Sequence, residues 1–155
     1  MSTEWNLGLL VDKKFAHLPP RDLLDAPVSA IKGVSEKDAE LLKEAFNIKT
    51  IRDLADNKYV KLAQAIVALA DVWEAALDKA FEDKSPKELV NAPVSALSGV
   101  SERDAELLKK AFAIKTIKDL ATKKYILVAQ VIKTLAMLQP IIEEMAKEVE
   151  EQAQE

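Results

Sequence analysis

The chain of 155 residues carries 22 basic and 26 acidic side chains, so its formal net charge is −4. It has no cysteine and only three glycines, which excludes disulfides, cysteine-ligated metals and the glycine-rich loops that hold nucleotide phosphates. With 49% hydrophobic and 31% charged residues the composition is typical of a globular protein, and without a signal peptide or an uninterrupted apolar span we expect a cytoplasmic location and no membrane contact.

A long internal repeat organises the chain. The block Ala26 to Ala70 aligns without a gap with Ala92 to Ala136, and 31 of the 45 positions are identical at an offset of 66 residues. This identity predicts a tandem duplication. We divide the chain into an N-terminal segment (1–10), a first repeat (11–76), a second repeat (77–142) and a C-terminal stretch (143–155).

Charge is distributed unevenly over these parts. The first repeat carries 10 basic and 11 acidic side chains, the second 11 and 8, and residues 143–155 carry 1 and 6. The second repeat is therefore mildly basic, and an acidic stretch follows it. This uneven distribution of charge affects which partners the chain attracts, and it does not determine the fold.

The first predicted element of each repeat is a helix. Apolar residues recur at helical spacing over residues 5–16, and this segment aligns weakly with residues 71–82. Both copies carry a phenylalanine near the predicted end of the helix, Phe15 and Phe81.

Two short helices should follow in each repeat. The first begins at a proline in its first turn, as in Ser85-Pro86 of the second repeat and Pro19-Pro20 of the first. The second begins after Asp25 or Asn91, which we expect to cap it. It ends at the glycine of a hairpin.

Longer helices are predicted after the hairpin. Capping-box patterns, in which Asp follows Ser or Thr by three residues, open two helices per repeat at Ser35, Thr50, Ser101 and Thr116. No glycine or proline interrupts the helical pattern from Lys58 to about Glu82, which predicts one long helix shared by the repeats. Its counterpart begins near Lys124 and should end or kink at Pro140, which has no backbone N–H. A last C-terminal helix completes an all-α fold.

The hairpins resemble a known motif. The segments Ile31-Lys32-Gly33-Val34-Ser35 and Leu97-Ser98-Gly99-Val100-Ser101, each with Ala four residues on, are similar to the helix-hairpin-helix motif of the SAM-like domain family. The resemblance covers residues 26–55 and 92–121. It implies two degenerate tandem hairpins. In family members that bind DNA, the backbone N–H groups of such hairpins hold a phosphate without reading sequence. Since Ser35 and Ser101 replace the motif's second glycine, we favour a purely structural hairpin here, with phosphate binding as the alternative.

The second hairpin is the candidate for nucleic-acid binding, because lysines cluster after it. Lysines and arginine contact phosphates independently of sequence. The candidate residues are Gly99, Val100, Ser101, Arg103, Lys109, Lys110, Lys123 and Lys124.

No residues form a catalytic pattern. His17 is the only histidine, and no nucleophile, base and acid recur in both repeats. The carboxylates alternate with lysines at helix-surface spacing, which indicates ion pairs on solvated faces. We therefore expect no enzyme activity, no metal and no cofactor.

The expected function is that of a non-enzymatic helical adaptor or scaffold. It would bind another protein, or a second copy of itself, through helix faces. Trp5, Leu9 and Leu10 crowd apolar side chains into the N-terminal segment and are the candidate interface. Two alternatives stay open, nucleic-acid binding through the second hairpin and an apolar ligand or cofactor held between the repeats.

Overall fold

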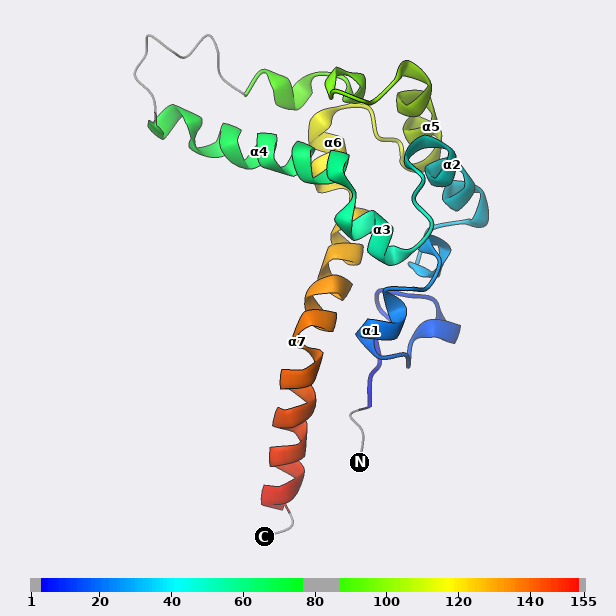
Figure 1. Cartoon of the computed structure of the whole chain (residues 1–155), viewed down its shortest axis with the longest axis vertical. Coiled ribbons are helices and arrows are strands. Elements are labelled where there is room, and N and C mark those ends of the chain that lie inside the picture. Colours follow the sequence, from blue (N-terminus) through cyan, green and yellow to red (C-terminus); the bar gives the residue numbers. More distant parts are fainter. Residues whose placement is uncertain (1–3, 77–86, 154–155) are drawn as a thin grey trace.

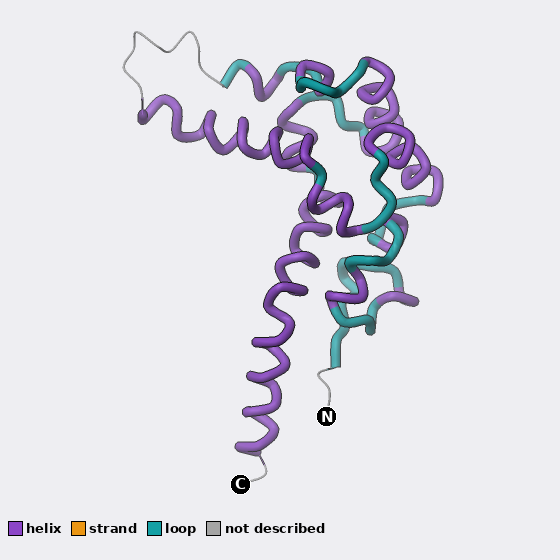
Figure 2. The backbone as a smooth tube through the Cα atoms, viewed as in Figure 1, coloured by secondary structure: helices purple, strands orange, loops and turns teal. Residues whose placement is uncertain are grey.

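The computed structural model describes residues 4–76 and 87–153, and these residues form helices and turns without any strand (Figures 1 and 2). The all-α prediction is thereby confirmed. The first repeat contains the 3-10 turns η1 (Lys13–Phe15) and η2 (Val28–Ala30) and the helices α1 (Pro20–Leu23), α2 (Glu36–Phe46), α3 (Ile51–Asp56) and α4 (Lys58–Ala76). The second contains η4 (Leu89–Asn91), η5 (Val94–Ala96), α5 (Glu102–Phe112), α6 (Ile117–Thr122) and α7 (Lys124–Ala153).

The elements recur at the repeat offset because the same residues start and stop them. The helices α2 and α5 begin at Ser35 and Ser101, which form capping boxes with the aspartates three residues on. Each of these helices ends at a residue in the left-handed region, Asn47 in the first repeat and Ala113 in the second. The start and stop positions correspond residue by residue at an offset of 66.

The two repeats are intertwined rather than separate. Helices α2 and α5 pack against each other, and each repeat packs its last helix on the other repeat, α4 on α6 and α7 on α3. Figure 1 shows α2 beside α5 at one side, with α4 and α7 leaving the body in different directions. Exchanging the repeats interchanges the α4–α6 and α7–α3 contacts and maps the α2–α5 contact onto itself. The two repeats are therefore related by a pseudo-two-fold axis within one polypeptide. As in a two-fold homodimer, the same surface of each repeat packs against its equivalent in the other, here α2 against α5.

Two reciprocal contacts lie between the repeats. The side-chain amides of Gln64 and Gln130, residues at the repeat offset, each donate to the other's oxygen at 2.8 Å. The ring of Tyr125 lies against Gly33 of the first hairpin, and the ring of Tyr59 lies against Gly99 of the second. Each hairpin is thus covered by the other repeat, and most of the apolar core is shared between them.

The predicted helix over residues 5–16 is wrong. These residues form turns and only η1 is helical. The backbone instead pairs with the end of η2, where Asp12 N donates to Ala30 O at 2.8 Å and Lys32 N donates to Leu10 O at 2.9 Å. Those long-range hydrogen bonds outweigh the local helical pattern.

The short helices differ from prediction in their caps. Pro27 and Pro93, and not Asp25 and Asn91, occupy the N-cap positions of η2 and η5, and neither cap has a side-chain hydrogen bond. The predicted start at Ser85-Pro86 and the last part of the predicted shared helix, residues 77–82, lie outside the described residues. Helix α4 is confirmed as far as Ala76.

The predicted helix end at Pro140 is wrong, because α7 continues through it to Ala153. Packing of the turns before the proline helps to offset the lost hydrogen bond. Gln139 accepts from Arg21 N of α1 at 3.0 Å and donates to Glu143 of the next turn at 2.9 Å. Ala136 and Ile132 of the preceding turns are buried.

Substitution of the hairpin glycines tests this packing. Gly33 and Gly99 have φ values of 95° and 93°, and a Cβ there would lie 2.9 Å from Tyr125 Oη or 2.8 Å from Tyr59 Oη. We expect Gly33→Ala and Gly99→Ala each to lower the free energy of unfolding by about 1–2 kcal/mol, measured by urea denaturation.

Gly8→Ala is the control, because its Cβ would lie 3.1 Å from the movable side chain of Asn6 and in ordinary contact, at 3.7 Å, with Ala16 Cβ. If the hairpin variants are as stable as Gly8→Ala, the hairpins do not rest on the tyrosines of the other repeat.

Candidate functional site

The second hairpin has few free donors for a phosphate. Ser101 Oγ accepts from Asp104 N at 3.0 Å, and Asp104 Oδ2 accepts from Ser101 N at 3.2 Å. Glu102 follows the cap and is exposed. A phosphate approaching this helix N-terminus would compete with two side-chain caps and meet a carboxylate, so the local charge opposes it.

The fold separates this hairpin from the lysines that were grouped with it. Arg103 lies 3.6 Å from Glu44 at the far end of α2, and Gly99 lies against Tyr59. Lys109 and Lys110 are in the last turn of α5, at the opposite end of that helix from the hairpin. The predicted site is therefore not a single surface.

The remaining lysines lie beside the first hairpin instead. Lys123 and Lys124 place their ammonium groups 5.8 and 5.1 Å from the centre of the Tyr125 ring, and that ring covers Gly33. Tyr125 also contacts Phe112 at the end of α5, with ring centres 4.8 Å apart. Sequence reasoning could not find this arrangement, because the two repeats exchange their last helices.

Helix α7 carries a second apolar face that the sequence reading missed. Its buried face packs on α3 and α1 and contains Ile126, Ala129, Ile132, Ala136 and Gln139. Seven apolar side chains of α7 are exposed. Six of them, which we call the α7 stripe, are Leu127, Val131, Leu138, Ile141, Met145 and Val149, and the seventh, Met137, lies about 80° to one side. At about 100° per residue the six fall within about 40° of one line, opposite the buried face.

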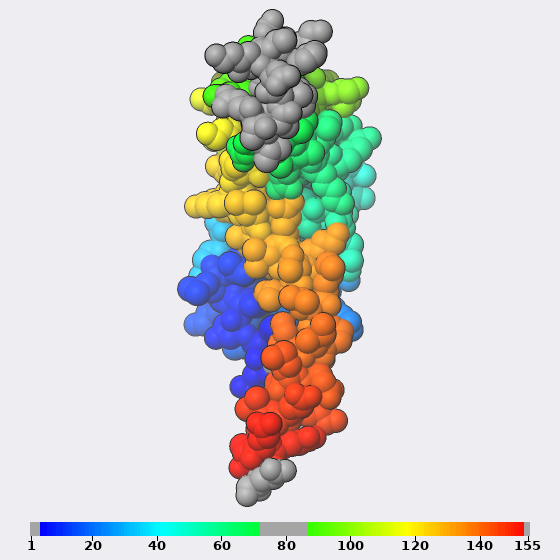
Figure 3. All heavy atoms as spheres, turned by 90° about the vertical axis from the view of Figure 1, so that its left-hand side faces the viewer, coloured from blue at the N-terminus to red at the C-terminus, as the bar shows by residue number. Residues whose placement is uncertain are grey.

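The stripe is long and open. From Leu127 to Val149 the helix rises about 33 Å, and the end of the helix runs past the last body contact we identify, at Gln139. Ile141, Met145 and Val149 are 58%, 60% and 65% exposed. In the view turned by 90°, α7 lies along the surface from the middle of the molecule to its end (Figure 3).

By length and composition alone, α7 is the one helix of the described residues that could cross a membrane, which the sequence reading did not predict. Its body-facing side carries a charge, however. Lys133 forms an ion pair with Asp56 of α3, and Lys61 lies 3.7 Å from the same carboxylate. A helix anchored in this way is part of the protein core along its first half.

Burial alone would raise the pKa of Asp56. The hydrogen bond from Lys133 and the charges of Lys133, Lys61 and Arg52 outweigh that effect, so the pKa lies below its ordinary value of 3.8. The corresponding positions of the other repeat are Thr122 and Val67. The ion pair therefore exists on one side of the pseudo-two-fold only, where it ties α7 to the first repeat.

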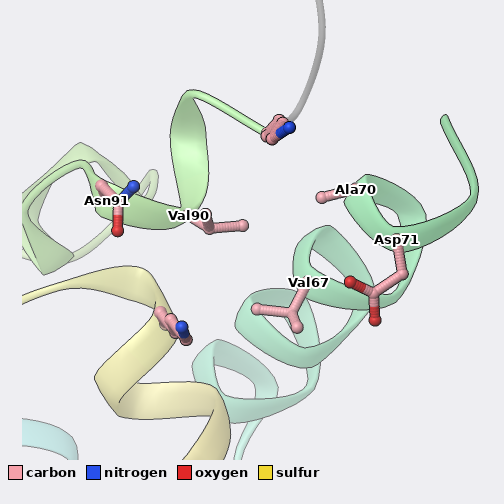
Figure 4. Close-up of a pocket in the computed structure, with 7 residues that line it drawn as sticks. Val67, Ala70, Asp71, Val90 and Asn91 are labelled. Carbon is pink, nitrogen blue, oxygen red and sulfur yellow. The ribbon is translucent and has the colours of Figure 1, made fainter. Parts of the chain in front are cut away.

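A cleft of about 420 Å³ opens between α4 and η4 (Figure 4). Val67 and Val90 point into it from opposite sides, and Asp71, Asn91 and Lys118 also line it. In the first repeat the equivalents of Asn91 and Lys118 are Asp25 and Arg52, which form an ion pair at 3.3 Å. The mixed lining gives little support to the expectation of an apolar ligand or cofactor.

The N-terminal candidates are not brought together. Leu9 is 92% exposed, whereas Leu10 packs against the core. Trp5 is half-buried with its indole N–H unpaired, and its carbonyl lies 3.0 Å from His17 Nδ1. Of the three predicted interface residues, only Leu9 is openly presented to a partner.

Comparison with protein-family models, curated proteins and solved structures gave no match. Among the described residues no group of three or more histidine or carboxylate side chains is placed to hold a metal ion. The α7 stripe is thus the feature of the described surface that most needs a functional explanation. Its spacing of three, four or seven residues was readable in the sequence, but the end or kink expected at Pro140 divided it.

The Asp56 ion pair gives a pH-dependent stability. Because the pKa of Asp56 is lowered on folding, its stabilisation is present above the unfolded pKa of about 4 and is lost as the pH falls below that value. Asp56→Asn should therefore lower the unfolding free energy at pH 7, by about 1 kcal/mol or less for a partly exposed pair, and have little effect in acid.

Asp25→Asn is the control. It removes an ion pair in which the carboxylate is 73% exposed, and it should cost less. Urea denaturation measures the unfolding free energy of each variant at neutral and at acid pH. If Asp56→Asn lowers it equally at both pH values, the assignment is contradicted.

Proposed function

We propose that this chain is a non-enzymatic helical binding module whose docking face is the α7 stripe. The observation that carries the proposal is the second apolar face of α7, which lies opposite the face that the helix already buries. Single exposed apolar residues are ordinary on protein surfaces, but a contiguous line of them indicates an interaction site.

The position of the stripe supports a protein partner. Apolar anchors at helical spacing are what a neighbouring helix or groove buries when it docks. Helix α7 is held firmly at its base by Ile126, Ile132 and the Lys133–Asp56 pair. This anchored half presents Leu127 and Val131 without a large loss of conformational freedom on binding, which favours affinity.

Nucleic-acid binding has less support. The caps of Ser101 and Asp104 occupy backbone N–H groups of the hairpin. The lysines lie at the other end of α5 from that hairpin. Binding to phosphates would then depend on scattered lysines alone, which gives only weak and strongly salt-dependent affinity.

Site-specific photo-cross-linking tests the proposal. A benzoylphenylalanine at Met145 of the stripe should form a covalent adduct with a protein, in the source cell or in a concentrated extract. The same group at Glu40, which is exposed on α2, is the control and should give no adduct. An adduct at both positions or at neither would overturn the proposed function, whatever the identity of the captured protein.

A further inference from the structure

The charges along α7 identify what covers its stripe. From Lys124 to Ile142 the helix contains no acidic residue, and Lys123 directly precedes it. Its last turns contain one lysine and five glutamates, which are Glu143, Glu144, Glu148, Glu150 and Glu151. One apolar stripe therefore runs from a basic end to an acidic end.

Within one chain this order of charges is unfavourable. The N-terminal end of a helix carries positive partial charge and the C-terminal end negative partial charge, so lysines at the start and glutamates at the end oppose the dipole. The chain gives the last turns little compensation, because Met145, Val149 and the glutamates around them are exposed. A second α7 running antiparallel would place its glutamates near the lysines and the positive end of the first helix. Its lysines would lie near the glutamates and the negative end, so the unfavourable charges are offset at both ends.

We propose that α7 pairs with α7 of a second copy of this chain in an antiparallel arrangement, a proposal that rests on the docking function of the α7 stripe. Centred near Leu138, the pairing places Val131 of one copy against Met145 of the other. Glu148, Glu150 and Glu151 of each copy then lie within about one turn of the positions opposite Lys123 and Lys124 of its partner. A parallel pair would instead bring five glutamates beside five, which is repulsive.

The same geometry supports the overhanging end of α7. The turns beyond Gln139 contribute only exposed or half-buried side chains. In the antiparallel pair these turns lie on Leu127 and Val131 of the partner, where the helix is fixed to the body through Ile126 and Ile132. The free half of each α7 is thus docked on the anchored half of the other, as a closed two-fold interface requires.

The oligomeric state of the full chain is the first test. Sedimentation velocity should show a species of about twice 17.1 kDa, and Leu138→Glu should weaken its association at least about tenfold while leaving the circular dichroism unchanged. Leu9→Glu, an equally drastic change at a 92% exposed position, should leave the association unchanged. A monomeric wild type, or a dimer that survives Leu138→Glu but not Leu9→Glu, would overturn the pairing.

Cysteine cross-linking tests the direction of pairing, and the chain offers a background free of cysteine. A mixture of Val131→Cys and Met145→Cys proteins should form a heterodimeric disulfide on oxidation. Met145→Cys alone should not, because in the antiparallel pair its two copies are about 21 Å apart, too far for a disulfide. Efficient cross-linking of Met145→Cys to itself would show parallel pairing and contradict the proposal.

Two further outcomes separate this inference from the docking function. If the purified chain is monomeric but Met145 cross-links to a different protein, the docking function stands and self-pairing is wrong. If the monomer cosediments with phosphatidylcholine vesicles and Leu138→Glu does not, the stripe binds lipid and both proposals fail.

Discussion

The exchange of last helices between the repeats is the constraint on which the rest of the structure depends. Neither repeat covers its own hairpin, because Tyr125 of the second repeat lies on Gly33 and Tyr59 of the first lies on Gly99. The Gln64–Gln130 amide pair joins the two exchanged helices. Removing either α4 or α7 would therefore expose the core of the opposite repeat, and the chain is expected to fold as one cooperative unit.

The function that we propose depends on where the repeats differ. Their shared residues build the caps, hairpins and core, which are equivalent in both halves. The differences concern α7, which is tied to the first repeat by Lys133 and Gln139 and extends to Ala153 with its stripe. Its counterpart α4 carries Val67 in place of Lys133. Both α4 and α7 project from the body (Figure 1), but only α7 carries this stripe.

Local signals predicted the helix starts well and the long-range arrangement poorly. The capping boxes at Ser35, Thr50, Ser101 and Thr116 form as the sequence indicates, because each depends on residues three positions apart. The helix expected over residues 5–16 is absent, since Asp12 and Lys32 use their backbone N–H groups in pairing between distant segments. Periodicity alone does not report such competition.

The same limit applied to the candidate site. The sequence grouped Gly99 and Arg103 with Lys123 and Lys124 because they belong to one repeat, whereas the fold places those lysines beside the hairpin of the other. Pro140 was expected to end or kink the helix from its chemistry, but the helix continues through it, and a contact with α1 at Gln139 holds the turn before it. Tertiary packing determines both the position of these lysines and the course of the helix at Pro140, and a single sequence does not show that packing.

Hydrogen–deuterium exchange of residues 141–153 as a function of protein concentration tests the central claim most directly. An isolated helix end frays and exchanges rapidly, so these amides should exchange fast in dilute solution. If the α7 stripe docks on a second copy, their protection should rise with concentration, and Leu138→Glu should abolish the rise. Exchange that is independent of concentration in the wild-type chain would contradict the account.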